Sequence, residues 1–116
     1  MTVEQFYIIN DEDYQEILGR LAKPERIVKY LKKYAESTYL DEMHAAIEAQ
    51  NWEEAFRMIH SIKGVGLNLG LQKFVMTCSP LCEALRNGAP AEPIEEMIEA
   101  VNRADISLRE DINLID

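Results

Sequence analysis

The sequence has little glycine or proline and no long apolar run. Its 116 residues include five glycines and four prolines, and no stretch approaches the roughly 18 to 20 apolar residues that span a bilayer. No segment shows the alternation of apolar and polar residues that is typical of a half-buried β-strand. The first twenty residues carry five acidic side chains, which argues against a secretory signal. A single helical domain is what remains, because this length supports one buried core.

Basic residues are also scarce. The 12 lysines and arginines stand against 21 acidic residues, which gives a formal net charge of −9. This balance argues against nucleic acid as a partner, because phosphate-backbone binding requires clustered Lys and Arg. Six of the 12 basic residues do lie between Arg20 and Lys33. They fit the solvated face of a helix, with a docking patch as the alternative.

The two cysteines, Cys78 and Cys82, are four residues apart. On a helix they would share a face, in a geometry poorly suited to a disulfide and consistent with reduced thiols in the cytosol. We therefore expect a cytoplasmic protein. A metal centre that combines these cysteines with His44 and His60 is a weak alternative, because their spacing matches no established zinc pattern. We expect no metal site.

Apolar residues recur at intervals of three and four, which predicts helices almost throughout. One helix should follow the polar cluster at 10–13, another should begin at Pro24, and a break is expected near residues 37–38. Asn51 is a good N-cap for a helix that ends near Gly70, and Glu54 completes a pattern like a capping box. Two further helices should span about 71–87 and from 90–93 to the C-terminus. We expect one all-α domain over 1–116, in which a helical extension (1–23) precedes an antiparallel up-down four-helix bundle (about 24–116).

The predicted helix at 51–70 has two different faces. With His60 at zero and about 100° per residue, an apolar stripe falls on the opposite side, so His60 should point towards water. The stripe consists of Ala55, Met58, Ile62, Val65 and Leu69, flanked by Ile59 and Gly66. The face that carries His60 consists of Glu53, Phe56, Arg57, Lys63, Gly64 and Leu67.

The residues on the face around His60 indicate nucleophilic chemistry at the imidazole. A neutral imidazole is a nitrogen nucleophile at physiological pH, since its reference pKa is roughly 6.5. Lys63 places an ammonium group one turn away, where it can neutralise an anion at the ring. Glycine inside a helix costs about 1 kcal/mol relative to alanine, so Gly64 and Gly66 indicate close approach, by a reacting group and by a neighbouring helix. Phe56 adds apolar surface beside the histidine.

Leu67 adds further apolar surface on the same face. An apolar patch ringed by charge is typical of a protein docking site. Although the chain is acidic, we expect Arg57 and Lys63 to leave a local positive spot.

The run HSIKG at residues 60–64, followed by NLG at 68–70, resembles the signature of histidine phosphotransfer (HPt) domains, which carry a His-x-x-Lys-Gly core. The resemblance covers about residues 25–115. It implies a four-helix bundle in which His60 is the phosphoacceptor, Lys63 the charge-neutralising neighbour and Gly64 the access residue. The sequence departs from the family at Val65 and Gly66, where small hydroxylic residues are common.

The resemblance implies a phosphocarrier in a two-component phosphorelay. His60 would accept a phosphoryl group from the phosphoaspartate of a receiver domain, docked over Phe56, Arg57 and Leu67, and pass it to another receiver. The expected partners are response-regulator receiver domains and, as a further candidate, a hybrid histidine kinase. We expect a monomer that binds no nucleic acid, membrane or cofactor, with Mg²⁺ on the partner receiver. No glycine-rich nucleotide cradle is present, so kinase activity of its own is not expected.

Two alternatives keep the same bundle. The first is a helical adaptor that docks a receiver or kinase without phosphorylation of His60. The second is the phosphoacceptor module of a chemotaxis-type histidine kinase, which would be attached to dimerisation and ATP-binding regions.

Overall fold

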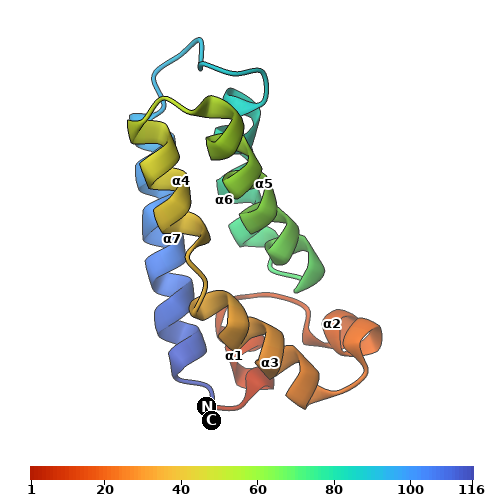
Figure 1. The fold of residues 1–116 in the computed structure, drawn as a ribbon. Helices are drawn as coiled ribbons and strands as arrows, with labels where there is room; N and C mark the ends of the chain where they lie inside the picture. The colour runs from red at the N-terminus through yellow and green to blue at the C-terminus, as the bar shows by residue number, and fades with distance from the viewer.

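The computed structural model describes residues 1–116 and consists of helices and connecting loops, without strands. Four helices lie side by side along the long axis of the molecule (Figure 1). They are α4 (Tyr39–Glu48), α5 (Trp52–Asn68), α6 (Gln72–Leu85) and α7 (Glu95–Asn113). Three shorter helices gather at one end of these four, next to both chain termini (Figure 1). They are α1 (Val3–Ile9), α2 (Tyr14–Leu21) and α3 (Pro24–Ala35). The predicted all-α bundle with short N-terminal helices is confirmed.

Short connections make the neighbouring helices of the bundle antiparallel. Three residues join α4 to α5 and three join α5 to α6, whereas a longer loop at 86–94 crosses the far end of the bundle to α7 (Figure 1). Gly70 has a φ of +68°, a left-handed conformation that lets the chain reverse after α5. The predicted break at residues 37–38 is confirmed, because α3 ends at Ala35 and α4 begins at Tyr39. No helix is both long enough and apolar enough to cross a membrane.

Asn51 caps α5 as predicted, since its side-chain oxygen accepts a hydrogen bond from the Glu54 backbone N–H at 3.3 Å. The second half of the predicted capping box does not form. The Glu54 carboxylate binds the Arg57 guanidinium at 2.7 Å instead of returning to the cap. An i,i+3 partner of opposite charge is the stronger attraction for this carboxylate.

All seven helices contribute to one hydrophobic core. The predicted stripe of α5 is buried except for Val65, which is half-buried. Phe6 of α1 and Ile27 of α3 are fully buried in the same cluster, so the N-terminal helices pack against the bundle and close one end of it. The division of the domain near residue 23 stays a prediction.

Hydrogen bonds fasten the N-terminal helices to the ends of α5 and α7. The Tyr7 hydroxyl donates to the Leu69 carbonyl at 2.6 Å, and burial of this phenol raises its pKa. The Lys32 ammonium donates to the carbonyls of Ile112 and Ile115 at 2.9 and 3.0 Å. This cation therefore lies at the C-terminus of α7, where the helix dipole favours positive charge.

A buried carboxylate joins α7 to the break between α3 and α4. Asp105 is 3% exposed, and it accepts hydrogen bonds from the Tyr34 hydroxyl at 2.5 Å and from Arg109 Nε at 2.8 Å. The Arg109 guanidinium also donates to the carbonyls of Ala35 and Ser37. Burial, followed by the hydrogen bond to Asp105, raises the pKa of Tyr34. The cluster satisfies backbone groups that the break leaves without helical partners.

Replacing Arg109 with methionine should lower the free energy of unfolding by about 2–4 kcal/mol, because the buried Asp105 carboxylate loses its cation. Urea unfolding followed by circular dichroism measures this loss. Arg103→Met on the same helix is the matched control, since the ion pair of Arg103 with Glu99 is exposed and should contribute less than about 1 kcal/mol. Similar losses for the two variants would contradict a structural role for the Asp105 cluster.

Candidate functional site

His60 lies midway along α5 and is exposed, whereas Ile59 and Ile62 beside it are fully buried. The predicted outward orientation of the ring is confirmed. His44 has an Asn102 oxygen 2.7 Å from its Nε2, but neither ring nitrogen of His60 forms a hydrogen bond within the chain. The imidazole of His60 is therefore open to an incoming group.

An aromatic contact orients the His60 ring. The ring of Phe56, one turn earlier, stacks on it with 5.5 Å between centroids and 22° between planes. The guanidinium of Arg86, from the end of α6, lies 5.2 Å from the Phe56 centroid. Arg86 is itself held by Glu83 at 2.7 Å. The Phe56 ring thus contacts both the His60 imidazole and the Arg86 guanidinium.

The positive charge of the site comes from fewer groups than the sequence suggested. Arg57 forms a close pair with Glu54, and Arg86 forms one with Glu83, so each guanidinium is largely compensated. Lys63 is half-buried and forms no ion pair. Burial raises the pKa of the Cys82 thiol, and the nearby Lys63 ammonium partly offsets that effect. Lys63 is therefore the free cation beside His60, and the expected contribution of Arg57 to a positive spot is reduced.

The two glycines of α5 differ in their surroundings, as predicted. A Cβ on Gly64 would have no atom within 4 Å, so the backbone at this position is bare and faces open space. A Cβ on Gly66 would lie 2.9 Å from Val75 Cγ2 and 3.3 Å from Phe74 Cδ2. Gly66 therefore permits close packing of α5 on α6, whereas nothing in the chain itself requires glycine at 64.

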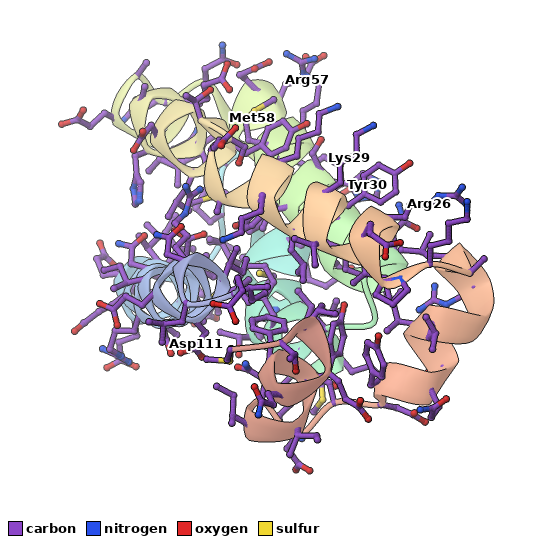
Figure 2. All side chains as sticks on the ribbon, turned by 90° about the horizontal axis from the view of Figure 1, so that it is seen from below. Arg26, Lys29, Tyr30, Arg57, Met58 and Asp111 are labelled. Atoms are coloured by element: carbon purple, nitrogen blue, oxygen red, sulfur yellow. The ribbon has the colours of Figure 1, made fainter.

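The predicted docking residues lie on the same side of α5 as His60. Arg57 is exposed, Leu67 is 54% exposed and Phe56 is half-buried. Figure 2 shows Arg57 on the same side of the molecule as Lys29 and Tyr30 of α3. A partner that covers His60 would meet the apolar surface of Phe56 and Leu67 on α5.

The family model of the Hpt domain matches residues 35–113, which include the four long helices and His60. This chain belongs to the Hpt domain family. Hpt domains are phosphocarriers of two-component signalling and have no kinase activity of their own. Searches of curated proteins and of solved structures found no match. The matched range does not include α1, α2 or nearly all of α3.

The residues of the alternative metal centre are not brought together in this Hpt domain. No group of three or more histidine, cysteine, aspartate or glutamate side chains is placed to hold an ion. Cys78 and Cys82 are free and fully buried, and burial raises the pKa of Cys78 to about 12. They pack as small apolar residues, while His44 is half-buried against Asn102.

Sequence reasoning missed Arg86 and Asp105. Arg86 reaches the site from α6, and no spacing within one helix could have placed it over Phe56. Asp105 did carry a signal, because it interrupts the buried side of α7 between Val101 and Leu108. A carboxylate on a buried face calls for a partner, and Arg109 one turn later provides it.

The two glycines should respond oppositely to alanine. Gly64→Ala should raise the free energy of unfolding by about 0.5–1 kcal/mol, because a Cβ in open space adds helix propensity. Gly66→Ala should lower it by about 1–2 kcal/mol, because overpacking against Val75 outweighs that gain. Urea denaturation of both variants measures the difference. A stabilised Gly66→Ala variant would show that α5 and α6 are not in close contact there.

Proposed function

We propose that this Hpt domain carries phosphoryl groups between receiver domains through His60. A ring nitrogen of the neutral imidazole attacks the phosphorus of a phosphoaspartate, a nitrogen–phosphorus bond forms, and the phosphorus–oxygen bond to the aspartate breaks. The aspartate leaves as a free carboxylate. The reverse reaction on a second receiver restores the imidazole. The observation that carries the proposal is the exposed ring of His60, with both nitrogens free of hydrogen bonds within the chain, in a chain of this family.

Two neighbours support the transfer. Phosphoryl transfer depends mainly on position and charge stabilisation, and Lys63 offers an ammonium group outside any ion pair, one turn from the ring. Gly64 offers bare backbone on which a receiver can approach without meeting a side chain. We assign charge neutralisation to Lys63 and access to Gly64.

Receiver domains are the partners we propose, with a hybrid histidine kinase as a further candidate. They would dock over Phe56, Arg57 and Leu67 and bring the Mg²⁺ that transfer needs, so this chain needs no cofactor. We also propose a cytoplasmic monomer. Two free, buried thiols support a reducing compartment.

His60→Gln should abolish acid-labile phosphorylation. The donors are the receiver domains encoded in the source genome, each phosphorylated with radiolabelled acetyl phosphate in the presence of Mg²⁺. The readout is transfer of the radiolabelled phosphoryl group to the Hpt domain. Because glutamine presents no ring nitrogen, we expect no labelled product. The exposed position of His60 should leave stability unchanged, and urea unfolding provides the control.

Two results would contradict the proposal. Label that persists in His60→Gln would place the phosphoryl group on another residue. Absence of label on the wild-type chain with every receiver, together with binding of one of them, would favour the adaptor instead.

We further assign Phe56 a positioning role. In place of a hydrogen bond, its stacked ring limits rotation of the His60 imidazole. Phe56→Leu keeps an apolar side chain and should lower the transfer rate at saturating receiver about tenfold, because a freely rotating ring is less often aligned for attack. Leu67→Ala is the contrasting variant, since loss of docking surface should raise the receiver concentration for half-maximal rate and leave the saturated rate unchanged. If Phe56→Leu changes only that concentration, Phe56 serves docking alone.

A further inference from the structure

Arg86 reaches the surroundings of His60 from a different helix. It is the residue that follows α6, and its guanidinium carbon lies 5.2 Å from the centroid of the Phe56 ring. Phe56 in turn stacks on the His60 imidazole, with 5.5 Å between the ring centroids. A cation over an aromatic face is attracted by the quadrupole of the ring. The three side chains therefore form a continuous series of contacts from the end of α6 to the ring of His60.

Glu83 holds the guanidinium of Arg86 in place. One carboxylate oxygen of Glu83, Oε1, accepts hydrogen bonds from Arg86 Nε at 3.1 Å and from Arg86 Nη2 at 2.7 Å. The hydrogen bond and the charge of Arg86 lower the pKa of Glu83, so the pair stays ionised at physiological pH. Charge-assisted hydrogen bonds from two nitrogens of one guanidinium add geometric definition as well as attraction. Glu83 therefore reduces the number of positions that the guanidinium can take beside Phe56.

The ring of His60 has few other contacts that could fix its plane. Neither ring nitrogen forms a hydrogen bond within the chain, and the side chain is exposed. The terminal torsion of a histidine side chain has a broad distribution, so the rotamer alone does not define the ring plane. Gly64, one turn later, has no side chain that could confine the ring. The stack on Phe56 is thus the contact on which the orientation of the imidazole depends.

We propose that Arg86 is a positioning residue for phosphoryl transfer, which acts on His60 through the ring of Phe56. The inference rests on the function proposed above for His60 and adds a contribution from α6. The guanidinium limits the motion of Phe56, and the stacked Phe56 ring limits rotation of the imidazole. A ring nitrogen that is aligned for more of the time attacks more often.

A simpler explanation for Arg86 is its place at the C-terminus of α6, where the helix dipole favours a cation. That attraction requires only the positive charge, whereas the proposed role requires the contact with Phe56. The two explanations therefore differ in what they predict for His60. The dipole predicts an effect on the stability of α6 alone, and the positioning role predicts an effect on the ring and on the rate of transfer.

The first measurement is an NMR comparison that needs no phosphotransfer. The stacked Phe56 ring should shift the ring-proton signals of His60, and loss of a signal in His60→Gln identifies them. Arg86→Met should move these signals towards their positions in Phe56→Leu, because the stack loosens without the cation. Arg86→Lys keeps a cation at the end of α6 and should retain most of the wild-type shift. Arg103→Met removes an exposed cation paired with Glu99 on α7, so this matched control should leave the signals unchanged.

The second measurement is the rate of transfer from a radiolabelled phosphorylated receiver. Arg86→Met should lower the rate at saturating receiver about twofold to fivefold, as expected for loss of a cation–π contact at an exposed position. The receiver concentration for half-maximal rate should stay unchanged. In the Phe56→Leu background the same substitution should have no further effect, because Arg86 then has no ring to hold. Arg103→Met should transfer at the wild-type rate, and urea unfolding confirms that each variant folds.

Three results would overturn the inference. The first is that the His60 signals of Arg86→Met coincide with those of the wild type. The second is an equal loss of rate from Arg86→Met with and without Phe56→Leu, which would mean that Arg86 acts directly on the phosphoryl group or the receiver. The third is a change confined to the half-maximal concentration, which would assign Arg86 to docking. Absence of label on the wild-type chain would instead overturn the function proposed for His60, and the NMR comparison would still decide whether Arg86 orders the ring.

Discussion

Burial of one side of α5 against the bundle determines where His60 points. The imidazole forms no hydrogen bond within the chain, so its direction is set by the apolar side chains on the opposite side of the helix. Turning α5 by half a turn would expose Ala55, Met58, Ile59 and Ile62, which are all buried. The three larger side chains each contribute about 1.5–3 kcal/mol when fully buried. Their sum is comparable with the roughly 5–15 kcal/mol net stability of a typical domain, so the core holds the histidine in the solvent.

The close approach of α5 to α6 follows from the same constraint. Gly66 lets α5 pack closely on the first turn of α6, near Phe74 and Val75. At the opposite end of α6, Arg86 lies over Phe56, which in turn stacks on His60. Gly64 has no such packing reason, since a Cβ there would have no atom within 4 Å.

The fold and most of the site could be predicted because both depend on periodicity along single helices. The 3.6-residue repeat places the stripe of α5 and therefore His60, and capping and turn residues such as Asn51 and Gly70 mark the helix ends. Most of what could not be predicted depends on contacts between helices. The pairing of Arg57 with Glu54 is local, yet the capping-box pattern favoured a different partner for the same carboxylate. The position of Arg86 over Phe56 results from the packing of α6 on α5.

The distribution of charge explains how an acidic chain can serve a phosphoryl group. Solvent-exposed charges further apart than about 8–10 Å are largely screened at physiological salt, so the net charge of −9 has little influence at His60. A cation about 4 Å from a phosphoryl charge contributes about 1 kcal/mol in water and about 4 kcal/mol near a protein surface. Lys63 is half-buried and forms no ion pair, whereas Arg57 and Arg86 are already paired. For the transfer that we propose at His60, a lysine one helical turn away therefore matters more than the excess of acidic residues elsewhere.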